Sequence, residues 1–176
     1  MTSVLLISII NSVLEKKEVV LNITMLGERV DSNGVILLEK QLVNSVVKDK
    51  SKEKVTIQNL KYEKESLHEA SRMGLQKVAA DITAGFIDIL IIDKEIFDEL
   101  SKGQQLKPLS NITGINHLGI VNHTPYYSSD EKIYGIGISK IDLLSSVDFD
   151  GEKVLCIPAN AKNVKSISEF FTVILK

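Results

Sequence analysis

The chain has 176 residues, enough for one domain with its own hydrophobic core, and its 44% of hydrophobic and 25% of charged residues suit a globular protein. The 21 basic residues nearly balance the 23 acidic ones, so no strongly basic face is imposed and we expect no nucleic-acid partner. A single cysteine, Cys156, excludes an intrachain disulfide, as in a cytosolic protein or an exported one from a lineage without disulfides.

The first residues are apolar. Residues 4–14, VLLISIINSVL, end at a charged Glu-Lys-Lys step. The run is shorter than the ~20 residues of a membrane-spanning helix, and it lacks the basic start and small-residue cleavage site of a signal peptide. Three interpretations stay open: an amphipathic helix of the domain, the outer half of a membrane anchor, or the apolar part of a signal sequence. We therefore separate residues 1–16 from a single α/β domain over residues 17–176.

Alternating apolar residues predict a first strand over residues 18–26, which Gly27 ends. A helix with one aliphatic face follows up to residue 47, with Ser32 or Asn33 as its cap. Residues 48–54, KDKSKEK, form a charge cluster with two interpretations, a solvated loop or a contact with an anionic membrane surface.

A second strand is predicted over residues 55–62. The capping box Ser66-Leu67-His68-Glu69 then opens a helix over residues 67–84, and Gly85 supplies the left-handed position after it. Residues 87–92 are apolar apart from Asp88 and too few for a helix, which is typical of a strand buried on both faces. It is the predicted central strand.

The second half of the chain begins with a short helix over residues 94–101, which we expect Asp93 to cap and Gly103 to end. In the polar region after Pro108, residues 117–121 are predicted to form a short edge strand. The further elements expected are a strand at 133–138, a helical turn at 140–147, a strand at 153–157 and an apolar-faced helix that Asn163 caps. The alternation of strands and helices predicts an α/β fold, a three-layer α-β-α sandwich with a mostly parallel central sheet of about five strands.

Four segments of the chain match sequence motifs of a known protein family. They are Ala84-Gly85, Asp88-Ile89-Leu90-Ile91-Ile92, the short helix around Phe97 with its tail at residues 103–109, and Ile157-Pro158-Ala159-Asn160-Ala161-Lys162. Together they resemble one lobe of the extracellular solute-binding proteins of ABC transporters, with the type 2 periplasmic-binding fold. The last segment is similar to the family's return to its first lobe, and Ile133-Tyr134-Gly135-Ile136 to the segment leading to its hinge.

The resemblance implies a single lobe. Between Gly135 and Cys156 the family places a second lobe, typically more than about 100 residues, and this chain has only a short connection there. Small membrane-anchored proteins of Gram-positive bacteria resemble such a single lobe. The resemblance therefore favours the anchor interpretation of residues 1–16 and a location at the extracytoplasmic face of the membrane, with the cytoplasm as the alternative.

Candidate ligand-binding residues lie after the strands, because ligands of open α/β sheets sit beyond the carboxyl ends of the strands. In this chain those positions are Gly27, Glu28, Glu63, Lys64 and Asp93. The competing interpretation makes Asp93 a helix cap and the other charges solvated loop residues. A lone lobe cannot close over a ligand, so we expect any small-molecule affinity to be reduced.

No catalytic, metal or cofactor motif is recognised. His117 and His123 have no acidic or thiol partner at ligand spacing, Cys156 lies within a predicted buried strand, and Gly135-x-Gly137 lacks the rest of a dinucleotide fingerprint. We therefore expect no enzyme, no cofactor and no metal.

The first functional hypothesis is a membrane-tethered extracytoplasmic domain that binds a membrane protein or a second copy of itself. The alternative is a reduced solute-binding protein that binds a small molecule for an ABC transporter.

Overall fold

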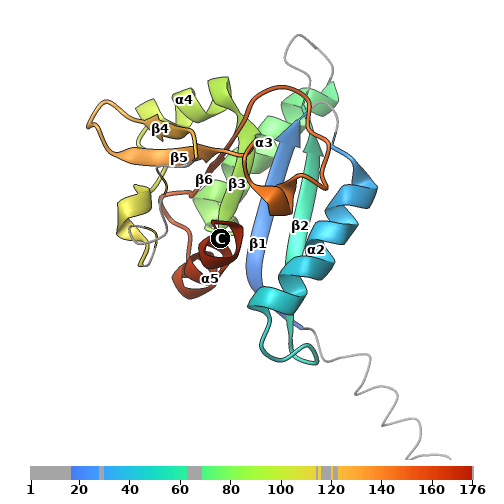
Figure 1. Cartoon of the computed structure of the whole chain (residues 1–176). Coiled ribbons are helices and arrows are strands. Elements are labelled where there is room, and N and C mark those ends of the chain that lie inside the picture. Colours follow the sequence, from blue (N-terminus) through green and yellow to red (C-terminus); the bar gives the residue numbers. More distant parts are fainter. Residues whose placement is uncertain are drawn as a thin grey trace, which may run out of the picture.

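A six-stranded sheet forms the middle layer of the computed structural model, which describes residues 17–27, 30–62, 69–113, 115, 120 and 123–175. The strand order is β2-β1-β3-β6-β5-β4 (Figure 1). In chain order the strands are β1 Glu18–Gly27, β2 Glu53–Lys61, β3 Ile89–Asp93, β4 Pro125–Tyr127, β5 Ile133–Gly137 and β6 Lys153–Cys156. The predicted central strand is therefore an interior strand.

The sheet is mostly, but not entirely, parallel. Strand β1 pairs in parallel with both β2 and β3, whereas β6 pairs antiparallel with both β3 and β5, and β4 pairs antiparallel with β5. Four strands therefore run in one direction, and β6 and β4 run in the other. This confirms the predicted fold class and adds β4, which the sequence pattern did not indicate.

Four α-helices cover the two faces in the described part of the chain. The helices α2 Ser32–Val46 and α5 Val164–Ile174 share one buried cluster with the sheet, and α3 Glu69–Ala84 and α4 Lys94–Lys102 share the other. Alternate residues of β3 enter the two clusters, Ile89 and Ile91 on one side and Leu90 and Ile92 on the other. The three-layer sandwich is thus confirmed.

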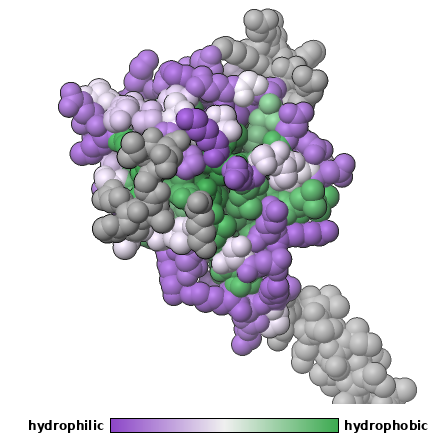
Figure 2. All heavy atoms as spheres, viewed as in Figure 1, coloured by the Kyte–Doolittle hydropathy of each residue, from purple (hydrophilic) through white to green (hydrophobic). Residues whose placement is uncertain are grey.

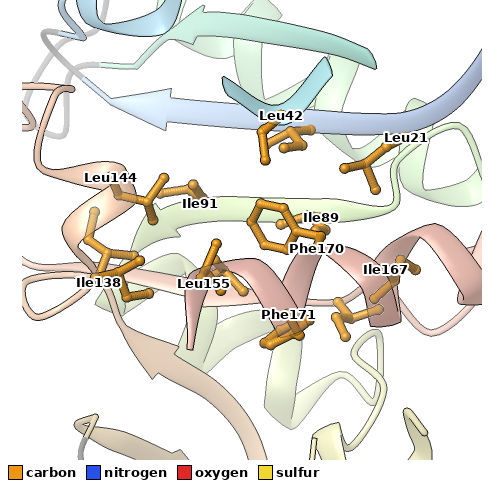
Figure 3. Close-up of a cluster of buried hydrophobic side chains, with 14 of the residues drawn as sticks. Leu21, Leu42, Ile89, Ile91, Ile138, Leu144, Leu155, Ile167, Phe170 and Phe171 are labelled. Atoms are coloured by element: carbon orange, nitrogen blue, oxygen red, sulfur yellow. The ribbon is translucent and has the colours of Figure 1, made fainter. Parts of the chain in front are cut away.

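The core between α2, α5 and the sheet is aliphatic with two aromatic rings. Figure 3 shows Leu42 of α2 and Phe170 of α5 turned toward Ile89 of β3. The rings of Phe170 and Phe171 lie edge to face, with centroids 5.8 Å apart, and both side chains are fully buried. Burying large apolar side chains of this kind provides most of the stabilisation of a domain of this size.

The segment that returns from β6 to α5 holds the end of α3. The side-chain amide of Asn160 donates hydrogen bonds to the carbonyls of Ile82 and Thr83, and the Lys162 ammonium donates to that of Ala84 at 2.9 Å. These are carbonyls that the end of a helix leaves unpaired. Gly85 follows with a φ of +66°, as predicted.

Several predicted caps were wrong. Asp31, and not Ser32 or Asn33, caps α2, because its carboxylate accepts from the amides of Asn33 and Gly34 at 3.1 and 2.8 Å. Asn163 stands before α5, but its side chain donates to the buried carboxylate of Asp88 instead of capping the helix.

Other expectations have mixed outcomes. The helical turn at residues 140–147 is a short 3₁₀ helix, η4 Asp142–Leu144. Ser66 of the predicted capping box and most of the predicted edge strand at 117–121 lie outside the described residues. None of the helices in the described ranges is long and apolar enough to span a bilayer.

Candidate functional site

The carboxyl ends of β1, β2 and β3 meet at one edge of the sheet, which we call the carboxyl edge. Gly27, Lys61 and Asp93 are the last residues of these strands. The structure therefore brings two of the predicted site residues, Gly27 and Asp93, to the same edge. The other three, Glu28, Glu63 and Lys64, lie outside the described residues.

A short connection, residues 138–152 between β5 and β6, lies over this edge. In Figure 1 this connection is the orange segment that passes the upper ends of β1 and β2. Phe149 forms an isolated antiparallel bridge with Val30, and the Asp31 amide donates to the Asp148 carbonyl at 3.4 Å. A Cβ at Gly34 would lie 2.1 Å from the Ser146 carbonyl oxygen, so the connection packs directly on the first turn of α2.

A buried lysine occupies the centre of the carboxyl edge. The Lys153 side chain is fully buried, and its ammonium lies 2.6 Å from Asp93 Oδ1 and 3.2 Å from Asp150 Oδ1. A Cβ at Gly27 would lie 3.0 Å from the Lys153 Nζ and 2.9 Å from Asp150 Oδ1. Glycine at position 27 thus leaves the space that this ion-paired cluster fills.

Asp93 does not cap its helix as expected. It stands at the N-cap position of α4, but its side chain makes no cap hydrogen bond. The physical reason is the Lys153 ammonium, because a charged hydrogen bond to a carboxylate is stronger than one from a neutral amide. Asp93 thus belongs to the ion-paired cluster.

Two hollows that contain strand ends lie beside the cluster. The larger has a volume of about 590 Å³ and contains the ends of β1 and β2; its lining residues are Gly27, Val30, Asp31, Asn59, Lys61, Asp148, Phe149 and Asp150. The smaller, of about 390 Å³, is lined by Tyr62, Asp93, Lys94, Glu95, Asp150, Gly151 and Glu152. Asp150 belongs to both linings, and its Oδ1 lies 3.2 Å from the buried Lys153 ammonium.

Both hollows are rich in carboxylates. The larger contains three aspartates and one lysine, and the smaller contains four acidic residues and one lysine. The side-chain hydrogen bond to Asp98 raises the pKa of Lys94, which keeps that ammonium charged. A site of this composition attracts cations and repels anions.

A tyrosine beneath the same connection is held by Glu152. Burial raises the pKa of Tyr126 to about 12, and the hydrogen bond that its hydroxyl donates to the Glu152 carboxylate adds to the shift. The hydroxyl therefore stays protonated and fixes Glu152 at the rim of the smaller hollow.

Among the described residues, no group of three or more His, Cys, Asp or Glu side chains is placed to hold a metal ion. Cys156 is completely buried in β6, and burial raises the pKa of its thiol, which leaves it protonated.

Sequence reasoning missed the residues that the connection contributes. Asp148, Asp150 and Lys153 come from the far end of the chain, over 120 positions after Gly27. One signal was present, because Lys153 begins a strand that is otherwise apolar and directly follows the acidic stretch DFDGE at residues 148–152. A lysine at the end of a buried strand beside carboxylates indicates an internal ion pair.

Comparison with known proteins gives one informative likeness. No family model and no curated protein matches the chain. A solved structure is similar, the spermidine/putrescine ABC transporter substrate-binding protein PotD from Streptococcus pneumoniae, described in complex with calcium and HEPES. The TM-score is 0.52 at 13% sequence identity, over 91% of this chain and 78% of that chain. The fold is similar to a solute-binding protein lobe. That likeness supports the predicted resemblance at the level of fold.

Proposed function

We propose that this domain is a reduced solute-binding protein that binds a small organic cation at the carboxyl edge. The larger hollow carries the proposal, since it contains Asp31, Asp148 and Asp150 against a single lysine, Lys61, and the buried Lys153 ammonium lies 3.2 Å from Asp150. Carboxylates that are already held by the fold bind ammonium groups through charge-assisted hydrogen bonds. Phe149 adds an apolar wall for the carbon chain of such a ligand.

Size and location support the proposal. A volume of about 590 Å³ falls within the range of about 300–1,000 Å³ for small-molecule sites, and the hollow lies beyond the carboxyl ends of parallel strands, where ligands of α/β sheets bind. The similar fold belongs to a protein named for spermidine and putrescine, both organic cations. In this proposal the domain acts at the extracytoplasmic face of the membrane, tethered through its N-terminal residues, and catalyses no reaction.

The affinity should be modest. In this proposal residues 138–152 stand where the family has its second lobe, so the ligand stays in contact with water on the open side of the hollow. Without closure, its charged groups are attracted through a medium of high dielectric constant. We expect a dissociation constant of about 0.1–1 mM, which corresponds to roughly 4–5.5 kcal/mol.

Isothermal titration calorimetry on the full chain tests the proposal, with spermidine, putrescine, magnesium and a neutral disaccharide as ligands. Spermidine should bind, and Asp148→Asn should weaken its binding about fivefold or more, since the variant removes one charge-assisted hydrogen bond. The matched control is Asp142→Asn, an equally exposed aspartate of the same connection that does not line either hollow. No spermidine binding at millimolar concentration, or equal losses in the two variants, would contradict the proposal.

The first functional hypothesis, binding of a membrane protein or of a second copy, stays a prediction. The acidic hollows favour the small-cation alternative, because protein interfaces concentrate their energy in buried aromatic and arginine anchors. The larger hollow contains one aromatic residue and no arginine.

A further inference from the structure

The opposite end of the sheet has the reverse charge. Strands β1, β2 and β3 begin there and β6 ends there. We call this region the amino-edge surface and define it by residues 17–19, 48–54, 86 and 162–165. Figure 2 shows hydrophilic side chains gathered at its lower end, over the connection between α2 and β2. This end has no part in the carboxyl-edge site.

Lysines dominate the exposed charges of the amino-edge surface. Its six exposed lysines are Lys17, Lys48, Lys50, Lys52, Lys162 and Lys165, whereas Glu18 is its single exposed acid. The other two acids within it are half-buried and bonded inside the domain. The Glu53 carboxylate accepts from the amides of Lys48 and Asp49, and the Asp49 carboxylate accepts from Ser51. Because the lysines of this surface outnumber all three of its acids, its net charge is positive, although the whole chain carries −2.

Apolar side chains stand among these lysines. Phe86 is 63% exposed, Val164 is 40% exposed and Val19 is 36% exposed. The Phe86 backbone is held in place, because its carbonyl accepts from the Asn22 side-chain amide. The Lys162 ammonium lies 5.9 Å from the centre of the Phe86 ring. Aromatic and aliphatic tips among lysines are typical of segments that lie in the headgroup region of a bilayer.

The path of the chain also indicates a lipid bilayer as the partner of this surface. The apolar residues 4–14 of the sequence lead into Lys17, which lies on this surface, with its ammonium donating to the Lys50 carbonyl at 2.6 Å. We propose that the amino-edge surface lies on an anionic lipid bilayer, with the lysines over the lipid phosphates and with Phe86 and Val164 inserted at shallow depth. The carboxyl-edge hollows, at the other end of the strands, then face away from the membrane.

Vesicle co-sedimentation of the full chain provides the first test. Vesicles of phosphatidylcholine with about 30% phosphatidylglycerol should bind the chain at 0.1 M salt, and 0.5 M salt should weaken this binding, because screening shortens the reach of the lysine charges. Replacing two lysines by Lys50→Glu and Lys52→Glu should lower the partition coefficient about tenfold or more. The matched control, Lys102→Glu with Lys140→Glu, reverses two exposed lysines outside this surface and should lower it far less.

A fluorescent probe tests the placement of Phe86. The chain has no tryptophan, so Phe86→Trp introduces a single indole. Its emission should shift to the blue and resist acrylamide quenching when anionic vesicles are added. Tyr127→Trp, at a similarly exposed site of 59% on β4, should show neither change.

Three results would overturn the proposal. Equal binding to purely zwitterionic vesicles, unaffected by the lysine variants, would assign the affinity to the apolar residues 4–14 alone. An unshifted Phe86→Trp emission on bound vesicles would place this surface away from the lipid. No vesicle binding at all would leave a protein as the partner. None of these results depends on whether the carboxyl-edge hollows bind a cation.

Discussion

The side-chain ammonium of Lys153 lies at the carboxyl edge, where ligands of this fold class bind. Its ammonium is fully buried between the carboxylates of Asp93 and Asp150, which are themselves partly exposed. Removing an ammonium from water is costly, and the attraction to two carboxylates offsets that cost. The geometry needs a residue without a side chain at position 27, because a Cβ at Gly27 would lie 3.0 Å from the lysine nitrogen.

Replacing Lys153 by Met should be strongly destabilising, because two neighbouring carboxylates lose their shared cation. We expect a loss of about 2–3 kcal/mol in the free energy of unfolding, below the range for a completely buried pair because both carboxylates still reach water. The measurement is urea denaturation. Adding Asp93→Asn to Lys153→Met should restore about 1 kcal/mol, and strict additivity of the two single changes would contradict the ion-paired cluster.

Two residues of the candidate site could be predicted from the sequence. Gly27 and Asp93 follow directly from strand periodicity and the rule for strand ends, and both lie at the carboxyl edge. Asp148 and Asp150 could not be predicted in this way, because they belong to a connection without periodicity, and tertiary packing sets the path of that connection. Asp93 was predicted as a helix cap or a ligand-binding residue and not as the partner of a lysine, since no local pattern announces a lysine 60 residues away.

Among the elements, the connection over residues 138–152 determines the shape of the site. It is anchored through η4, whose Leu144 is buried in the core against the sheet (Figure 3). Its Ser146 carbonyl lies against Gly34 in the first turn of α2, where no larger residue fits. The connection therefore forms one wall of the larger hollow and is fixed by close backbone contact.

Gly34→Ala should destabilise the domain despite the better helix propensity of alanine. Propensity alone would stabilise α2 by about 1 kcal/mol, but the added Cβ would lie 2.1 Å from a backbone oxygen and push the connection away. We expect a net loss of about 1–3 kcal/mol by urea denaturation. Gly103→Ala is the control, because its φ of −76° suits alanine and its nearest neighbour lies at 3.4 Å. A neutral or stabilising Gly34→Ala would show that the connection is not packed on α2.

Elements with strong periodicity were predicted well, and those fixed by pairing were not. The strands β1 and β2 and the helices α2 and α4 lie within a few residues of their predicted ranges, because their apolar faces repeat at the expected spacing. Strand β6 was predicted, but an apolar run does not indicate whether the strand runs parallel or antiparallel to its neighbours in the sheet. Strand β4 has three residues and begins with Pro125, so only its pairing with β5 defines it.

The whole molecule has two chemically different ends. Carboxylates line the hollows where the strands end, and exposed lysines surround the points where they begin. The order of elements predicted the layers that separate these ends, because short β-α connections leave few possible topologies. Charge distribution over a surface was beyond sequence reasoning, since it depends on which loops the fold brings together.

Cys156 provides a probe of global stability. It is fully buried in an interior strand, and burial raises the pKa of its thiol, so reaction with a thiol reagent requires opening of the sheet. At pH 8 we expect the native domain to react at least about 1,000-fold more slowly than the urea-unfolded chain. Reaction followed by absorbance measures this ratio. A rate near that of the unfolded chain would mean that β6 is not an interior strand.

The place of β6 also has a consequence for biosynthesis. This strand lies between β3 and β5, and it comes after both of them, and after every other described strand of the sheet, in chain order. Until residues 153–156 have left the exit tunnel, the nascent chain can pair β1 with β2 and β3, and β4 with β5, but it cannot join the two sets. The domain must therefore complete its folding after residues 153–156 have been synthesised, and a chain truncated before β6 would present two unpaired strand edges to chaperones.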